Sequence, residues 1–239
     1  MAIFASESVE PSTFWDNARS AKKILVLDLG FLGDTVHLIP ALWNARKAWP
    51  DAELHVMVAE HIMPLMTVTP WLDGVWGYPR FPKGPKPWQD FGRIRKLRAA
   101  KFDVVINVNG SDRSSLLTWL SGAKWRLGRR PDDGGPWHWP FFFTHIVDHP
   151  YKTEILWKQR RRCVEKAGLP TINDSAFPVT IPTEARRRVG ISEDLDNRYI
   201  HISPFTTQDH KELPLNELAT LIDSLPCLLY TSDAADDTP

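Results

Sequence analysis

Short aliphatic runs alternate with segments of helical periodicity along most of the chain. Residues 24–27 (ILVL) form a β-branched and aliphatic run bounded by Gly30, which is typical of a buried parallel strand. After Gly33 the apolar positions fall on one side of a helix that runs to about Trp49, and residues 54–58 (LHVMV) predict a second strand. This strand, helix and strand form a β-α-β unit, so we expect a parallel sheet with right-handed crossovers.

The same alternation continues to about residue 170. The pattern predicts helices near residues 91–100, 113–120 and 152–167, with strands at residues 103–108 and 124–128. Strands that alternate with helices indicate an α/β doubly wound domain with a Rossmann-like parallel sheet. The aromatic and proline-rich segment 131–143 is too apolar to be left in water, so we expect it to pack as a lid or along an interface.

The chain divides into five parts. Residues 1–21 lack the basic start and apolar core of a secretory signal, and we interpret them as a partly frayed N-terminal extension. Residues 22–170 are the first domain, and residues 171–197, with their prolines and glycine, are the connector. A strand at 199–203 and a helix at 215–225 begin a second Rossmann-like domain, residues 198–226, which we expect to be truncated.

The last segment, residues 227–239 (CLLYTSDAADDTP), has no structural connection to the amphipathic run before it. It resembles the translation of an adapter used in DNA library preparation, so we expect a non-native tail on a gene that was cut at this point. A natural acidic tail is the alternative.

Composition is that of an ordinary soluble globular protein, with 43% hydrophobic and 24% charged residues. No stretch approaches the roughly 20 apolar residues that span a bilayer, so we expect a cytoplasmic protein. The two cysteines, Cys163 and Cys227, support neither a disulfide framework nor a zinc site. The lone D-x-D sequence, Asp194 to Asp196, lies in the polar connector, and we predict no metal and no cofactor.

Basic residues gather in residues 80–101, where eight lysines and arginines stand against one acid, Asp90. Such a segment is either a solvated helix face or a binding site for an anionic partner. The chain has no net charge and no nucleic-acid motif, so nucleic acid is the less favoured partner. A phosphorylated lipid, or peripheral contact with the inner face of the cytoplasmic membrane, fits better.

The turn after the first strand, LDLGFLGDTVHLIPAL at residues 27–42, is the strongest local signal, because parallel sheets bind ligands at the carboxyl ends of their strands. Gly30 and Gly33 allow a tight turn and close approach to a ligand. Asp34 is either a helix cap or a catalytic carboxylate, and His37, one turn later, is either a substrate contact or an ordinary helix histidine.

A dinucleotide-binding interpretation of this turn is weak. The spacing is G-x-x-G and lacks the full glycine fingerprint, although Asp51 and Glu53 lie about where a ribose-binding acid would stand. A nucleotide-dependent oxidoreductase is therefore a disfavoured alternative.

Three segments occur in a specific order and spacing: ILVLDLGFLGDTVHLIPAL (24–42), FDVVINVNGSDRSSLLTWLSGAKWRLGRRP (102–131) and HISPFTTQDHKELPLNELATLI (201–222). Together they resemble glycosyltransferase family 9, the lipopolysaccharide heptosyltransferases. There are two departures. Asp28 stands where many members carry a basic residue, which changes the charge of the cleft and leaves the acceptor open, and Leu213 replaces the usual tryptophan before Pro214.

The resemblance implies a GT-B architecture, in which an acceptor-binding domain and a sugar-nucleotide-binding domain face each other across a cleft. It implies inverting transfer of a heptose or related sugar from a nucleotide-diphosphate donor, of the ADP-heptose kind, to a lipopolysaccharide core or similar anionic lipid-linked glycan. The family's catalytic aspartate corresponds to Asp34, which would act as general base, with Gly33 and His37 at the acceptor.

By the same resemblance Thr206, Thr207 and Lys211 would hold the donor's diphosphate, where hydroxyls and an ammonium group neutralise the growing negative charge. Without the resemblance, Lys211 is a solvated loop lysine and the threonines form a turn. A non-catalytic, acceptor-binding fragment is the alternative function. Since the second domain supplies one strand and one helix, we expect this chain to be inactive alone.

Overall fold

The computed structural model describes residues 11–80, 90–132, 134–150, 154–171, 178–188, 202 and 212–224. The chain divides into two compact units, residues 1–181 and residues 182–239. In the second unit the structure describes two helices, α7 (Thr183–Arg188) and α8 (Leu215–Asp223). The strand expected at residues 199–203 lies outside the described residues, apart from residue 202.

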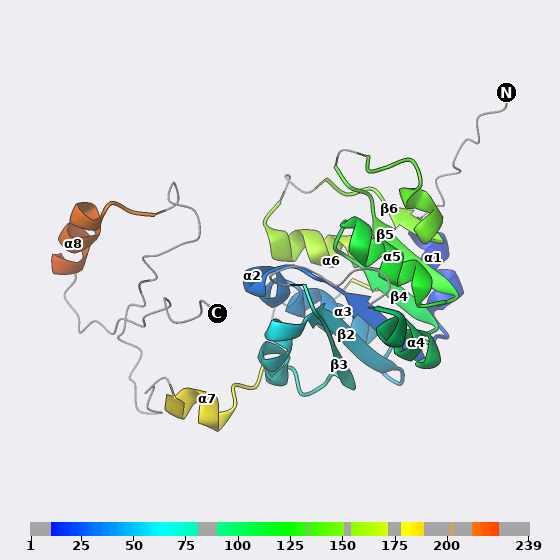
Figure 1. Cartoon of the computed structure of the whole chain (residues 1–239), viewed down its shortest axis with the longest axis horizontal. Coiled ribbons are helices and arrows are strands. Elements are labelled where there is room, and N and C mark those ends of the chain that lie inside the picture. Colours follow the sequence, from blue (N-terminus) through cyan, green and yellow to red (C-terminus); the bar gives the residue numbers. More distant parts are fainter. Residues whose placement is uncertain are drawn as a thin grey trace. The chain divides into compact units, whose positions relative to one another are not determined.

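The first unit is built on a six-stranded sheet with the order β3-β2-β1-β4-β5-β6 (Figure 1). The strands are β1 (Lys23–Leu27), β2 (Glu53–Ala59), β3 (Gly74–Tyr78), β4 (Val104–Asn107), β5 (Trp125–Arg129) and β6 (His145–Val147). Every neighbouring pair is parallel, and in the centre Val26 pairs with Val56 on one side and Ile106 on the other. The predicted α/β, Rossmann-like fold is confirmed.

Side chains alternate along each strand, so every strand contributes to both faces of the sheet, and helices bury both faces. Ile24 and Val26 point to one core, which is covered by α1 (Pro11–Ala18), α3 (Ile39–Ala48) and α6 (Leu156–Lys166). Leu25 and Leu27 point to the other, which is covered by α4 (Phe91–Ala99) and α5 (Asp112–Leu120). The helices thus hold the sheet from both sides and leave its strand ends for loops.

The N-terminal helix α1 differs from the predicted frayed extension. Phe14 and Ala18 are fully buried in the core, and the indole Nε1 of Trp49 donates a hydrogen bond to the carbonyl of Ala18 at 2.9 Å. Within the N-terminal extension expected to be partly frayed, helix α1 is therefore packed on the core of the first unit, where Phe14 covers one face of the sheet.

The single helix predicted between Gly33 and Trp49 is two helices, α2 (Leu32–Val36) and α3. Pro40 is the reason, because it has no N–H to donate and its ring would clash with the carbonyl four residues earlier. The break falls before Ile39, so Pro40 stands in the first turn of α3, where proline is tolerated. Similarly α6 begins at Leu156, later than predicted.

Several elements were not predicted: the strands β3 and β6 and the 3₁₀ helices η1 (Glu60–Val68) and η3 (Trp139–Phe142). The aromatic residues of segment 131–143, which was expected to form a lid or an interface, differ in their exposure. Trp139 and Phe143 are buried, whereas Trp137 and Phe141 are exposed. No helix in the described residues is long and apolar enough to cross a membrane.

Candidate active site

The carboxyl ends of β1 and β4 mark the point where the strand order reverses. From β1 the chain builds β2 and β3 on one side, then crosses to β4, β5 and β6 on the other. In open α/β sheets, ligands bind outside the carboxyl ends of the strands at such a switch point. The loops that follow β1 and β4, together with α2, therefore form the candidate site.

Asp34 lies in the first turn of α2 and is partly exposed. Its Oδ2 accepts a hydrogen bond from the backbone N–H of Phe31 at 2.8 Å, which is the contact of a capping carboxylate. Within the part of the chain that the structure describes, no hydrogen bond reaches Oδ1 of Asp34. One carboxylate oxygen of Asp34 thus stabilises the helix start, and this contact does not occupy the other oxygen.

The two glycines of the turn differ in what they do. A Cβ on Gly30 would collide with the side chain of Asp34, so Gly30 is required for the close approach of that carboxylate to the turn. A Cβ on Gly33 would meet nothing within 4 Å, and Gly33 is exposed. No atom of the protein occupies the space beside the Cα of Gly33, so a ligand could approach the backbone there. His37, the C-cap of α2, is also exposed.

Asp28, directly after β1, is fully buried and paired. Its Oδ1 accepts hydrogen bonds from the backbone N–H of Gly30 at 2.9 Å and from Nδ2 of Asn109 at 3.1 Å. Its Oδ2 lies 2.8 Å from Nη2 of Arg160 on α6, and Arg160 also donates to the carbonyl of Val108. One ion pair therefore ties together the loop after β1, the loop after β4 and α6.

Burial raises the pKa of the Asp28 carboxyl above its ordinary value, against the opposing effects of the Arg160 guanidinium and of the hydrogen bonds from Asn109 and Gly30. In this fold the Asp28 carboxylate is paired with a buried guanidinium, and the expected change in the charge of the cleft stays a prediction. Sequence reasoning missed Arg160, which is one of three consecutive arginines on α6.

We predict that Arg160→Met lowers the free energy of unfolding by about 3–5 kcal/mol, because it leaves the Asp28 carboxylate buried without its partner. Urea unfolding of the chain measures this. Arg162→Met is the matched control. Arg162 lies on the same helix as Arg160 and pairs with Glu154, but its side chain is 52% exposed, so we expect a loss of at most about 1 kcal/mol. Equal losses of unfolding free energy in the two variants would show that the buried pair contributes no more to stability than the exposed pair.

Polar contacts also fix the neighbouring strand ends. At the end of β3, the hydroxyl of Tyr78 donates to the carboxylate of Asp90, the N-cap of α4. After β4, Oγ of Ser111 accepts from the N–H of Ser114 and begins α5. These contacts hold both helix starts at the same edge of the sheet as Asp34.

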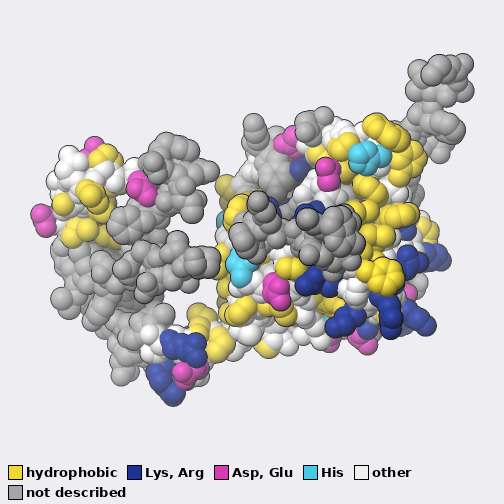
Figure 2. All heavy atoms as spheres, in the orientation of Figure 1, with side chains coloured by type: hydrophobic (Ala, Val, Ile, Leu, Met, Phe, Trp, Pro, Cys, Tyr) yellow, Lys and Arg dark blue, Asp and Glu magenta, His cyan; other side chains and the backbone are white. Residues whose placement is uncertain are grey.

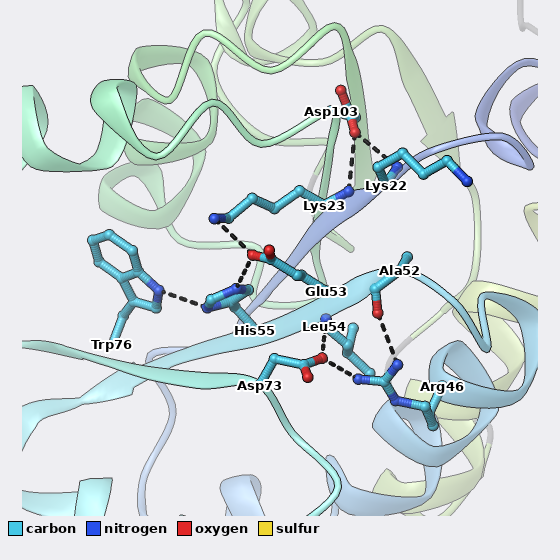
Figure 3. A network of polar contacts seen from close by, with 10 residues as sticks. All are labelled: Lys22, Lys23, Arg46, Ala52, Glu53, Leu54, His55, Asp73, Trp76 and Asp103. Carbon is cyan, nitrogen blue, oxygen red and sulfur yellow. Dashed lines mark hydrogen bonds and ion pairs between the residues drawn. The ribbon is translucent and has the colours of Figure 1, made fainter.

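The polar network in Figure 3 lies at the opposite edge, where the strands begin. Asp103 accepts hydrogen bonds from the backbone N–H groups of Lys22 and Lys23, and Glu53 contacts the side chains of Lys23 and His55 (Figure 3). Glu53 is the first residue of β2, far from the carboxyl ends where a nucleotide would bind. It therefore cannot act as the ribose-binding acid of a dinucleotide site.

The predicted donor-binding residues Thr206, Thr207 and Lys211 lie outside the described residues. Among the residues that the structure does describe, no group of three or more His, Cys, Asp or Glu side chains could hold a metal ion. In the described residues, the candidate site therefore consists of Asp34, Gly33 and His37, which are at least partly exposed, and of the buried ion pair between Asp28 and Arg160.

Known proteins resemble this chain in sequence. Lipopolysaccharide heptosyltransferase 3 of Escherichia coli is 24% identical over 119 residues, which are 49% of this chain and 35% of the relative. A putative glycosyltransferase of Haemophilus influenzae is 30% identical over 107 residues, 44% of this chain and 30% of the relative. The chain thus spans about a third of the length of these relatives.

Solved structures show the same fold. A glycosyltransferase family 9 structure from Veillonella parvula matches with a TM-score of 0.70 and 20% identity, covering 84% of this chain and 58% of that one. The E. coli heptosyltransferase WaaC with ADP-2-deoxy-2-fluoro heptose matches with a TM-score of 0.67 and 18% identity, covering 89% and 69%. These likenesses confirm the GT-B-type fold.

The model of the family described as glycosyltransferase family 9 (heptosyltransferase) matches residues 92–226, which are more than half of the chain. This match includes β4, β5 and β6, with the buried Arg160, and it extends into the second unit. The chain belongs to glycosyltransferase family 9.

Proposed function

We propose that the uninterrupted protein transfers a heptose, or a related sugar, from a nucleotide-diphosphate donor to a lipopolysaccharide core or a similar lipid-linked glycan. The observation that carries the proposal is Asp34, a partly exposed carboxylate at the switch point of the sheet, next to the open backbone of Gly33. Membership of the family supports sugar transfer as the reaction class. The bound ligand named for the WaaC structure favours an ADP-linked heptose as donor.

Asp34 would act as general base and take the proton of an acceptor hydroxyl. The hydroxyl oxygen then attacks the anomeric carbon from the face opposite the diphosphate, so that a new C–O bond forms as the bond to the leaving group breaks. This displacement inverts the anomeric configuration. Asp34 suits the role because its Oδ2 is held by the N–H of Phe31, which fixes the carboxylate in place.

The remaining residues would bind the two substrates. Gly33 and His37, both exposed on α2, would contact the acceptor in the first domain, residues 22–170. Thr206, Thr207 and Lys211, in the second domain beginning at residue 198, would neutralise the charge that grows on the leaving diphosphate. If residues 198–226 cannot perform this role alone, the chain is an acceptor-binding fragment, which is the second candidate function.

The acceptor is anchored in a membrane, and the basic segment 80–101 would meet that membrane at its cytoplasmic face. Residues 81–89 lie outside the described residues, and the rest is mainly α4. There Arg93 pairs with Asp90 at 3.1 Å, whereas no acid in the described residues forms an ion pair with Arg95, Lys96 or Arg98. These three exposed side chains, together with the exposed Lys101 after the helix, are available to anionic lipid.

We predict that neutralising Arg93, Arg95 and Arg98 with glutamine weakens binding to anionic vesicles, most clearly at low salt. Each basic residue near the surface contributes about 1 kcal/mol of attraction, and salt screens it. Co-sedimentation with vesicles across a salt series measures this. Because Arg93 is already paired, Arg93→Gln alone should have a smaller effect than Arg95→Gln. Vesicle binding that stays constant in every variant would make this helix an ordinary solvated face.

A further inference from the structure

Exposed and half-buried aromatic side chains form a row from α5 to η3. The ring of Trp119 on α5 lies 6.4 Å from Phe142, which is 5.8 Å from His138, and His138 is 5.5 Å from Trp137. Trp137 in turn lies 6.3 Å from Phe141. Trp119 is 49%, Phe141 70% and Trp137 84% exposed. We call these five side chains the aromatic row.

The chain holds this row outward by burying the residues in between. Trp139 is fully buried, and its Nε1 donates to Oγ of Ser115 on α5 at 2.9 Å. Phe143 packs on β5 where Gly128 has no side chain, since a Cβ there would collide with the phenyl ring. With Trp139 and Phe143 held in the interior, the 3₁₀ turn of η3 between them leaves Trp137 and Phe141 exposed.

Cations border the same surface. Helix α4 packs beside α5, and the guanidinium of Arg98 lies over Gly122 at the end of α5, within 4 Å of where a Cβ would stand. Lys124 follows at the start of β5 and is exposed. Figure 2 shows hydrophobic side chains over α5 and the region before β6, with Lys and Arg side chains next to them over α4. Aromatic and basic groups thus share one side of the first unit.

We propose that the aromatic row, together with the basic face of α4, is a membrane-binding surface whose rings insert into the interfacial region of an anionic bilayer. Aromatic side chains favour the boundary between head groups and acyl chains, and neighbouring cations bind the anionic head groups. The strength of such interfacial binding increases with the apolar area that is buried and with the electrostatic attraction to anionic lipids. The surface rests on the proposed function only in that the acceptor is lipid-linked.

The ring geometry favours a lipid surface over a glycan platform. Neighbouring rings of the row are inclined to each other by 53° to 87°, so consecutive rings do not present one flat face on which a sugar chain could lie. A row of inclined, projecting rings suits insertion between lipid head groups. Ser111, the N-cap of α5, follows the carboxyl end of β4, whereas Trp119 lies near the other end of this helix and Lys124 directly precedes β5. The surface therefore covers the α5 side of the first unit and extends toward the edge where the strands begin.

The test is flotation of the 239-residue chain with vesicles of phosphatidylethanolamine and phosphatidylglycerol, and with vesicles of phosphatidylcholine alone. We expect Trp137→Ser with Phe141→Ser to lower the partition coefficient for the anionic vesicles by about tenfold or more, because both rings lose their burial in the interface. Ile155→Ser is the matched control: Ile155 is 58% exposed, but it precedes α6 on the other face of the sheet. It should bind as the parent does.

Trp137→Phe with Phe141→Trp keeps both rings and should restore binding, which separates loss of the anchor from loss of the fold. Parental binding by the double serine variant would overturn the proposal. So would a variant that keeps vesicle binding but loses affinity for water-soluble, deacylated core oligosaccharide, since the row would then be a glycan site. Vesicle binding needs no donor, so a failure of the proposed sugar transfer leaves this measurement unaffected.

Discussion

Replacing Asp34 with asparagine in the uninterrupted protein should lower kcat for sugar transfer by about 10²–10⁴-fold, the usual contribution of a general base. The amide cannot take the proton of the acceptor hydroxyl. Its Oδ1 can still accept the hydrogen bond from the N–H of Phe31, so the start of α2 should be preserved. A radiolabelled or mass-spectrometric transfer assay under saturating donor and acceptor measures the change.

Asp112→Asn is the control for this variant. Asp112 is also an acid in the first turn of a helix that follows a strand of the sheet, here α5 after β4. If kcat depended only on a negative charge at the start of a helix, both variants would lose activity to the same extent. If Asp34 is the general base, only Asp34→Asn should lose it. If transfer by Asp34→Asn stays within a few-fold of the parent, Asp34 is a cap and its catalytic assignment fails.

The second large effect concerns the 239-residue chain itself, which we expect to show no measurable transfer. A GT-B enzyme reacts between two complete domains, and the described part of the second unit here consists of α7 and α8. Helix α7 buries no residue, and α8 buries Leu218. We therefore expect that Thr206, Thr207 and Lys211, which lie outside the described residues, are not held in this chain to the fraction of an ångström that catalysis requires.

Calorimetric titration of the purified chain with ADP-heptose tests this expectation, beside a transfer assay on the lipopolysaccharide core acceptor. We expect negligible donor affinity for the chain and clear affinity for the uninterrupted protein under the same conditions. Micromolar donor binding by the chain would mean that residues 198–226 suffice for the diphosphate site.

The central strands were predictable because β-branched and aliphatic runs such as ILVL are buried on both faces of a parallel sheet. The strand β3, with the sequence GVWGY, was missed since two glycines interrupt its pattern. Helix α1 was missed because its burial depends on Phe14, whose surroundings come from distant strands. Local sequence signals describe the first kind of element and leave out the second.

The candidate site divides in the same way. The turn with Gly33 and Asp34 was predictable, because its small residues and acid lie within one short segment that resembles the family's pattern. The partner of Asp28 was not, since the three arginines of α6 look alike in the sequence. In the fold Arg161 pairs with Glu165 and Arg162 with Glu154, and Arg160 alone of the three reaches Asp28.

The most direct test of the account is to incubate the uninterrupted protein with ADP-heptose and lipopolysaccharide core acceptor and to analyse the product. We predict a mass increase of one heptose on the acceptor, with an anomeric configuration, determined by NMR, opposite to that of the donor. Hydrolysis of the donor with no modified acceptor, or a product with retained configuration, would contradict the account.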